Sequence, residues 1–358
     1  MRAAVCRGPE EALVIEDLDL RAPESREVRV RLQASGICHS DVHLIQGEWG
    51  DLDKPVVAGH EGVGIVDAVG ELATRAVAGD RVIVSLIASC GTCRACARGW
   101  LHLCQGRPKY APRLRRPNGD EVACGFDSAT FAEATVVHES QVVPIGDAVP
   151  HDCAGLLACA VITGVGSVWN SARVKPGESV VVIGAGGVGL NAVQGAALVG
   201  AETVVAVDLV EGKLTAAREF GATHVVDGSG DGDTVEAVRD ITDGADHVLV
   251  TVGSRAAILQ GLDMLGPRGT LAAVGIPPRD EAELPLTMRS AFGGERRLMG
   301  VGMGSTNLMV DVPRLIHLYE QGRLKLDELV TQTYPLEGIN DGIAAMMDGR
   351  ALRNVLVY

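Results

Sequence analysis

Four consecutive apolar residues, Val180–Ile183, run directly into a glycine-rich turn, and an apolar stretch of helical character follows to Gly200. The turn reads Gly184-Ala185-Gly186-Gly187-Val188-Gly189, which matches the G-x-G-x-x-G spacing between a predicted strand and a predicted helix. In such a turn Gly184 permits the tight bend, Gly186 lets a pyrophosphate approach the backbone, and Gly189 lets the helix pack closely on the strand. The segment therefore predicts a strand–turn–helix unit that binds a dinucleotide at the helix N-terminus.

The next predicted strand, Thr203–Val207, ends in Asp208, nineteen residues after Gly189. A carboxylate at that position hydrogen-bonds the ribose hydroxyls of NAD and repels the 2′-phosphate of NADP. Lys213 follows five residues later and is a second candidate for contact with the same ribose. We therefore expect a dinucleotide site that prefers NAD.

Further predicted strands lie at Thr223–Val226, His247–Val252 and Thr270–Val274, with helical patterns between them. Strands that alternate with helices indicate a doubly wound parallel sheet with right-handed crossovers. A length of 358 residues is sufficient for two domains. We therefore expect an α/β protein in which this sheet forms one domain.

The chain before Gly146 has a different pattern, with short β-rich segments such as Glu27–Ala34, Gly62–Val69 and Arg81–Leu86 separated by Gly and Pro. After Met299 the pattern is mixed, with a predicted helix at Val312–Gln321 and a final strand at Asn354–Tyr358. The N-terminal part is therefore expected to form a β-rich domain.

The chain carries 32 basic and 46 acidic residues, for a formal net charge of −14. Nucleic acids and anionic membranes repel such a protein, so neither is expected as a partner. Two uncharged runs, Cys153–Ala172 and Ser179–Ala201, are long enough to span a membrane, but the second contains six glycines and divides into strand, turn and helix. Met1–Glu11 shows no basic stretch followed by an apolar core, so we expect no signal peptide and a cytoplasmic location.

In a reducing cytosol the nine cysteines are expected to be metal ligands or free thiols rather than disulfides. Four of them follow the spacing C-x2-C-x2-C-x7-C, which suits a closed tetrahedral zinc site. A ferredoxin-type iron–sulfur motif begins in the same way, but its fourth cysteine comes three residues later and is followed by proline. Structural zinc is therefore the favoured interpretation for Cys90, Cys93, Cys96 and Cys104.

A second set of candidate ligands is dispersed along the chain. Cys38 begins a segment with a hydroxyl, a carboxylate and two imidazoles, His60-Glu61 precedes a glycine-rich strand, and Cys159 lies at the entry to the αβ region. Two thiolates and one imidazole leave a fourth zinc position open, as a catalytic zinc ion requires. Spacing alone does not pair these residues, and a buried cysteine such as Cys159 is more often a small core residue.

These motifs together resemble those of zinc-dependent alcohol dehydrogenases of the medium-chain dehydrogenase/reductase superfamily, and the resemblance runs nearly from end to end. It implies a GroES-like catalytic domain at 1–159 with a structural zinc lobe at 90–104, a Rossmann NAD-binding domain at 160–299, and a C-terminal return to the catalytic domain at 300–358. The segments that carry it are Gly36–His43, Ala58–Gly64, Cys90–Cys104, Cys159–Gly164, Gly184–Gly189, Asp208–Lys213, Val274–Pro278 and Leu352-Arg353.

The resemblance implies that Cys38, His60 and Cys159 hold a catalytic zinc ion with Glu61 beside it, for two zinc ions per chain in all. It also implies roles for residues around these ligands. Asp41 would orient His60, Ser40 and His43 correspond to the family's proton relay, and Trp49 matches a bulky residue of the substrate pocket. For the cofactor, His39 stands where the family often has an arginine against the pyrophosphate, and Arg353 matches another pyrophosphate contact. Thr163 and Val274 match residues that hold the nicotinamide.

The expected activity is reversible NAD-dependent oxidation of a small alcohol to an aldehyde or ketone, by hydride transfer to nicotinamide. Two alternatives of the same fold stay open: a dehydrogenase of a formaldehyde–thiol adduct, and an oxidoreductase that retains its nicotinamide. A catalytically silent relative is disfavoured because all three ligands and Asp208 are present.

The stretch Arg107–Arg116 contains five basic residues. We expect this stretch to form a solvated loop, and the alternatives are a subunit contact or a site for an anionic substrate tail. The long segment from Cys104 to Phe131 resembles that of the family's dimeric branch, so we expect a homo-oligomer, with a dimer favoured over a tetramer.

Overall fold

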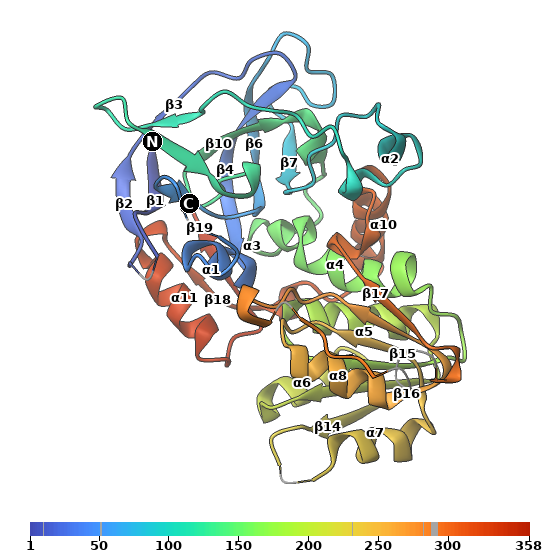
Figure 1. Ribbon diagram of the computed structural model, residues 1–358. Helices are drawn as coiled ribbons and strands as arrows, with labels where there is room; N and C mark the ends of the chain where they lie inside the picture. The colour runs from blue at the N-terminus through green and yellow to red at the C-terminus, as the bar shows by residue number, and fades with distance from the viewer. Residues whose placement is uncertain (10, 51, 231, 282, 288–292) are drawn as a thin grey trace. The chain divides into compact units, whose positions relative to one another are not determined.

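The computed structural model describes residues 1–9, 11–50, 52–230, 232–281, 283–287 and 293–358 (Figure 1). The described chain divides into two compact units. Unit 1 comprises Met1–Cys159 and Asn307–Tyr358, so the chain leaves this unit and returns to it, and unit 2 comprises Ala160–Thr306.

Within its described residues, unit 1 is built on two sheets, which confirms the expected β-rich N-terminal part. One sheet has the order β2-β1-β5-β9-β8-β3, with bounds Val14–Asp17, Arg2–Cys6, Val56–Val57, Glu121–Cys124, Leu114–Arg115 and Asp19–Leu20. The other has the order β11-β7-β6-β4-β19-β18, with bounds Val142–Pro144, Arg81–Val84, Glu61–Val69, Glu27–Ile37, Arg353–Val357 and Val330–Tyr334, and β10 (Ala134–His138) also pairs with β4.

Short helices connect and cover these strands. The α-helices of unit 1 are α1 (His39–Ile45), α2 (Arg94–Ala97), α3 (His151–Ala154), α10 (Leu308–Glu320) and α11 (Ile339–Met347). The 3-10 helices are η1 (Leu101–Leu103), η2 (Gly125–Asp127), η3 (Glu139–Gln141), η4 (Gly155–Ala158), η9 (Asp327–Leu329) and η10 (Leu336–Gly338).

The predicted start of the helix at Val312 is wrong, because α10 begins at Leu308 and Pro313 lies inside it. The helix continues through the proline because Leu308, Val312 and Leu315 bury one face, and this packing outweighs the hydrogen bond that the proline cannot donate.

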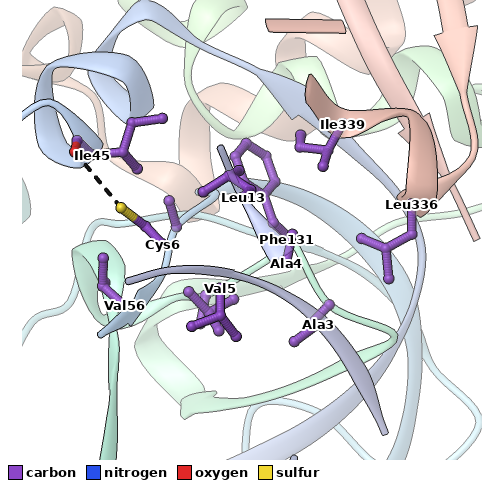
Figure 2. Packing of buried hydrophobic residues seen from close by; sticks show 14 of the residues in the cluster. Ala3, Ala4, Val5, Cys6, Leu13, Ile45, Val56, Phe131, Leu336 and Ile339 are labelled. Atoms are coloured by element: carbon purple, nitrogen blue, oxygen red, sulfur yellow. Dashed lines mark hydrogen bonds between the residues drawn. The ribbon is translucent and has the colours of Figure 1, made fainter. Parts of the chain in front are cut away.

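The core of unit 1 gathers around Phe131, whose side chain has no exposed surface. Its ring lies among Ala4, Leu13 and Ile339, which come from distant parts of the sequence (Figure 2). The backbone N–H of Phe131 also donates a hydrogen bond to the carbonyl of Ala58 (3.0 Å). This core therefore supports the loop that precedes His60.

Unit 2 contains a parallel sheet with the order β14-β13-β12-β15-β16-β17, the strand order of a Rossmann fold. The prediction of a doubly wound parallel sheet is therefore confirmed. In that order the strands span His224–Asp227, Thr203–Asp208, Ser179–Ile183, Ala245–Val250, Leu265–Ala273 and Arg297–Gly300. Its helical segments are α4 (Ala160–Gly166), the π-helix η5 (Ser167–Ala172), α5 (Gly187–Val199), α6 (Glu211–Glu219), α7 (Thr234–Thr242), α8 (Arg255–Met264), η6 (Arg279–Glu281), η7 (Gly293–Glu295) and η8 (Met303–Ser305).

Alternate residues of the central strands form the core on one face of this sheet. Val181 and Ile183 of β12 and Val248 and Val250 of β15 pack in one cluster with residues of α7 and α8, including Val238, Ile258 and Leu262. Alternation of this kind follows from the two-residue period of a strand. The run predicted as a strand, turn and helix, Ser179–Gly200, forms β12 and α5 and ends with Gly200 in the left-handed region at φ 84°.

Among the described residues no single helix is both long and apolar enough to cross a membrane. The broken pair His151–Ala158 and Ala160–Ala172 passes that test by length and composition alone.

The substitution Phe131→Ala is expected to lower the free energy of unfolding by about 3–5 kcal/mol, because it leaves a cavity in the core of unit 1. Urea unfolding followed by circular dichroism measures the change. Val77→Ala is the matched control, since Val77 is 62% exposed and its truncation should change stability by less than about 0.5 kcal/mol. Equal effects of the two substitutions would contradict the role of Phe131 in the core.

Candidate active site

Three strands of unit 1 bring the dispersed candidate residues to one place. Strand β4 ends at Ile37, immediately before Cys38, and β6 begins at Glu61, immediately after His60. Gly36 of β4 is paired with Glu61 of β6, and on the other side Ile37 is paired with Asn354 of β19. The pairing therefore places Cys38, His60, Glu61 and Arg353 at the same end of the sheet.

The carboxylate of Asp41 holds this region together from a fully buried position. It accepts hydrogen bonds from the backbone N–H groups of Cys38 (3.2 Å) and Gly59 (2.8 Å), and from Nδ1 of His60 (3.0 Å). The bond to Nδ1 fixes the tautomer of His60 and leaves Nε2 without a hydrogen-bond partner, although Nε2 is buried. The structure thus gives Asp41 the orienting contact that the resemblance implies.

The buried Nε2 atom of His60 lies in a group of potential metal ligands. One ligand atom each from Cys38, His60, Glu61 and Cys159 lies within 4.8 Å of the others, and all four residues are buried. Two sulfurs and an imidazole nitrogen are ligands that zinc prefers, and a buried nitrogen without a partner is satisfied when it binds a metal. The residues present therefore fit a zinc ion.

The hydrogen bond between the two thiols of this group favours the state in which one is a thiolate and the other keeps its proton. A hydrogen bond from Cys159 lowers the pKa of Cys38, and the same bond raises the pKa of Cys159, which burial raises further. The guanidinium of Arg353 also favours the thiolate of Cys38. A thiolate is the form of cysteine that binds metals.

Arg353 and Glu61 form a buried ion pair between β19 and β6. Burial raises the pKa of Glu61 to about 7, although Arg353 opposes the shift. The second carboxylate oxygen of Glu61, Oε1, has no hydrogen-bond partner. A side chain on Gly36 would come within 2.1 Å of the Glu61 carboxylate, so glycine is required there. The role that the resemblance gives Arg353, a pyrophosphate contact, stays a prediction.

The relay candidates lie on α1, which begins at His39 directly after Cys38. Ser40 is partly buried on this helix and His39 is exposed. The ring of His43 stacks on Trp49 with centroids 4.9 Å apart, and Trp49 contacts the edge of Phe126. Phe126 in turn lies 4.8 Å from the ring of His60, in a left-handed backbone conformation at φ 52°. Sequence reasoning missed Phe126, since no local pattern shows that its ring faces His60.

The four-cysteine lobe is also brought together as predicted from its spacing. The sulfur–sulfur distances are 3.5 Å for Cys93–Cys96 and Cys104–Cys90, 3.9 Å for Cys93–Cys104 and 4.0 Å for Cys90–Cys96. Four sulfurs bound tetrahedrally to one zinc ion at about 2.3 Å are about 3.8 Å apart, so the set fits one metal ion. A cluster of several iron atoms needs its cysteine sulfurs farther apart.

Backbone N–H groups prepare two of these cysteines for metal binding. The N–H groups of Cys96 and Gln105 lower the pKa of Cys93 to about 5, and those of Thr92 and Cys93 lower the pKa of Cys90 to about 7. Both shifts favour the thiolate near neutral pH. Cys6, Cys124 and Cys153 belong to neither group of candidate ligands and are free thiols, as expected.

In unit 2 the glycine turn has the form that a dinucleotide site needs. Gly184 has φ 95°, and a side chain on Gly189 would come within 1.7 Å of the Gly184 carbonyl oxygen. A side chain on Gly186, in contrast, would meet no atom within 4 Å. Gly186 is the N-cap of α5, so the open space lies where the N-terminal N–H groups of this helix favour an anion.

Asp208 ends β13 and is held beside this turn. One of its carboxylate oxygens accepts a hydrogen bond from the N–H of Ala185 (2.6 Å), and the other accepts bonds from Leu209 and Val210. These bonds fix the carboxylate at the carboxyl end of the sheet, where doubly wound folds bind ligands.

Other predicted cofactor residues of unit 2 also lie near the carboxyl ends of its strands or on nearby helices. Val274 follows β16, Lys213 lies on α6, and Thr163 lies on α4 with its hydroxyl 3.8 Å from the sulfur of Met303. Sequence reasoning missed three exposed apolar side chains that follow β13, β15 and β16. These are Leu209, Val252 and Ile276, with exposed fractions of 67%, 38% and 58%.

Three of the five basic side chains in the stretch Arg107–Arg116 form hydrogen bonds or ion pairs within unit 1. Arg113 bonds the carbonyl oxygens of Asp127 and Val136, Arg115 pairs with Glu121, and Arg116 pairs with Glu16. A cavity of about 540 Å³ is lined by the cations Lys54, Lys109 and Arg113 and by the carboxylates Glu121 and Asp127. Lys54 pairs with Glu121, and Arg113 pairs with Asp127. The mixed charge of this cavity does not favour an anionic ligand.

Comparisons with known proteins agree with this geometry. Residues 24–147 match the family model of the alcohol dehydrogenase GroES-like domain, and residues 187–321 match that of the zinc-binding dehydrogenases. An NDMA-dependent alcohol dehydrogenase from Amycolatopsis methanolica is 37% identical, over 100% of this chain and 98% of the relative.

Two solved structures are similar over 99% of this chain and 98% of their own. They are an alcohol dehydrogenase zinc-binding domain protein from Burkholderia ambifaria (35% identity, TM-score 0.93) and benzyl alcohol dehydrogenase from Acinetobacter calcoaceticus (32% identity, TM-score 0.92). With full-length similarity and both family models matched, the resemblance inferred from the motifs is confirmed. The chain belongs to the zinc-type alcohol dehydrogenases of the medium-chain dehydrogenase/reductase superfamily and is an oxidoreductase.

Proposed function

We propose that the protein is an NAD- and zinc-dependent dehydrogenase that reversibly oxidises a small alcohol to an aldehyde or ketone. The observation that carries the proposal is the buried group of Cys38, His60 and Cys159, in which Nε2 of His60 has no other partner. Three protein ligands leave a further coordination position for a substrate oxygen. When bound, zinc lowers the pKa of an alcohol hydroxyl as a Lewis acid, and NAD accepts a hydride.

The chain's own residues would bind the metal and move the proton. Asp41 holds the ring of His60 with Nε2 toward the ligand group, so little reorganisation is needed on metal binding. The hydroxyl of Ser40 would accept the proton that leaves the alcohol, and His43 would take it on toward solvent, since its side chain is partly exposed. Trp49 and Phe126 would limit the size of the substrate beside His60.

The residues of unit 2 support the cofactor assignment. The open space at Gly186 would accept the pyrophosphate, and Asp208 would bind the adenosine ribose of NAD, with Lys213 beside it. The exposed side chains of Leu209, Val252 and Ile276 offer apolar surface for the adenine ring. Thr163 and Val274 would hold the nicotinamide, and His39 and Arg353 are proposed as pyrophosphate contacts.

We propose a structural role for a second zinc ion at Cys90, Cys93, Cys96 and Cys104, because four thiolates leave no position for a substrate. A homodimer and a cytoplasmic location stay predictions from the sequence. The formaldehyde–thiol adduct also stays a prediction, and the internal pairing of Arg113, Arg115 and Arg116 does not favour it.

A second candidate, an oxidoreductase that retains its nicotinamide, is favoured by one relative, whose name states that it depends on NDMA. The two candidates differ in the added compound that alcohol oxidation consumes, which is NAD for the first and NDMA for the second. An alcohol panel supplied with NAD should produce free NADH for the first candidate. Turnover that requires NDMA and leaves added NAD unreduced would support the second.

Elemental mass spectrometry of freshly purified protein is expected to find two zinc ions per chain, one for each ligand group. Cys38→Ser should reduce this to one and lower turnover by about a thousandfold or more, since loss of the Lewis acid removes several kcal/mol of transition-state stabilisation. NAD binding, measured by calorimetry, should persist. Cys124→Ser is the matched control, because Cys124 belongs to neither group, and it should keep two zinc ions. Full activity of Cys38→Ser would contradict the proposed metal site.

Two alanine substitutions in the glycine turn should separate cofactor binding from folding. Gly186→Ala is expected to leave the melting temperature unchanged but to weaken NAD binding by about tenfold or more, because the new methyl group occupies the open space. Gly189→Ala should lower the melting temperature, because its methyl group collides with the Gly184 backbone. Gly212→Ala, on α6 with no atom within 4 Å, is the control that should change neither binding nor folding adversely. Unchanged NAD affinity in Gly186→Ala would place the pyrophosphate elsewhere.

A further inference from the structure

A carboxylate outside the predicted set contacts the proposed relay histidine. Nδ1 of His43 is hydrogen-bonded to Oε2 of Glu48, and both side chains are partly buried, with 24% and 34% exposure. We propose that Glu48 is a positioning residue that sets the tautomer and orientation of His43 for proton transfer. This inference rests on the proposed function, because it assigns Glu48 a part in the same reaction.

The backbone places Glu48 against His43 independently of the side chains. Helix α1 ends in a turn in which Gly47 has φ 71°, a left-handed conformation that glycine adopts without strain. The N–H of Glu48 donates to the carbonyl of His43 (3.0 Å), and the N–H of Gly47 donates to that of Leu44 (3.1 Å). These two bonds form a Schellman motif, which returns the chain over the last turn of the helix. The Glu48 side chain therefore starts from a fixed backbone position beside the imidazole.

The ring of His43 is held on its face as well as its edge. Trp49, the next residue after Glu48, stacks on the imidazole at 4.9 Å with 27° between the planes. The indole is itself fixed by an edge contact with Phe126, at 6.4 Å between centroids. With Glu48 at Nδ1 and Trp49 on the face, rotation of the ring about its side-chain torsions is opposed by both neighbours.

The contact determines which nitrogen can accept a proton. A carboxylate accepts hydrogen bonds only, so its partner Nδ1 carries the hydrogen in the neutral ring and Nε2 keeps its lone pair. In the proposed relay, the Ser40 hydroxyl accepts the alcohol proton as it gives its own to Nε2 of His43, and Nε2 later releases a proton to solvent, while Nδ1 keeps its own hydrogen. No electrons move in this step, and the ring passes from neutral to singly positive and back. The Glu48 carboxylate faces the ring while it is positive, as the carboxylate of a catalytic triad does for its histidine.

The first test reads the tautomer directly, by ring ¹⁵N chemical shifts of the enzyme labelled with ¹⁵N-histidine. The His43 signals are assigned by their loss in His43→Gln. In the wild-type enzyme we expect the hydrogen of neutral His43 on Nδ1. In Glu48→Ala it should move in part to Nε2, whereas Glu48→Gln should keep it on Nδ1, because the amide oxygen still accepts the bond. An unchanged tautomer in Glu48→Ala would overturn the inference.

The second test uses kinetics. Glu48→Ala should lower kcat about tenfold with little change in KM for the alcohol, since one part of general-base catalysis is lost while binding is not. Glu48→Gln should lose less. In a His43→Gln background, Glu48→Ala should cause no further loss, because its effect passes through His43. Equal losses from Glu48→Ala in both backgrounds would show that Glu48 acts in another way and would overturn the inference.

Glu320→Gln is the matched control, because Glu320 lies beside a surface histidine, His317, on α10 at 3.7 Å with 49% of its side chain exposed. It should change neither kcat nor the His43 signals. A lower melting temperature in Glu48→Ala would reveal a folding defect, in which case Glu48→Gln and the tautomer measurement decide. If the wild-type enzyme oxidised no alcohol, the proposed function would be contradicted. The ¹⁵N shifts would still decide whether Glu48 fixes the tautomer of the His43 ring.

Discussion

The candidate active site depends on one buried carboxylate. Asp41 has no exposed surface and satisfies its charge with three hydrogen bonds, from the N–H groups of Cys38 and Gly59 and from the ring of His60. A buried charge is tolerated only when it is fully hydrogen-bonded, so these contacts are strongly coupled. They connect the start of α1 to the loop before β6 and fix which nitrogen of His60 remains available.

A second buried pair ties the C-terminal segment into the same region. Arg353 of β19 and Glu61 of β6 are joined across the end of β4, and the charge of Arg353 also favours the thiolate of Cys38. Breaking a buried ion pair by removing one partner costs about 3–5 kcal/mol, because the other charge is left unpaired. The return of the chain to unit 1 therefore contributes to the electrostatics of the site, and the site is sensitive to the loss of either partner, even though the ligands come from the N-terminal part.

Glycine makes the close approaches in both units possible. In unit 1 the backbone at Gly155 lies so near Glu61 that a side chain would come within 2.4 Å of its carbonyl oxygen, and this approach positions the segment that leads to Cys159. In unit 2 the same requirement at Gly189 lets α5 pack on the turn after β12. Gly186 is different, since the space beside it is open within the chain. A side chain is thus excluded at Gly155 and Gly189 by nearby backbone atoms, whereas none lies within 4 Å of the position it would take at Gly186.

Contiguous motifs determined much of this protein from sequence alone. The strand and glycine turn at Ser179–Gly189, the acidic residue at Asp208 and the four cysteines of the lobe at 90–104 were all predicted from spacing, because each depends on residues that are close in the chain. Cys38, His60 and Cys159 are different, because their spacing does not relate them. Only the resemblance of the whole set of motifs to those of one protein family suggested that they act together. The tertiary structure decided that β4, β6 and β19 end at one place, that Arg353 faces Glu61, and that Phe126 lies against His60. It also decided the contact of Glu48 with His43, where the helix end is local but the side-chain direction depends on packing with Trp49. These features could not be predicted from the sequence because strand pairing and burial bring together residues that are far apart in the chain, and a pattern of neighbouring residues carries no information about them.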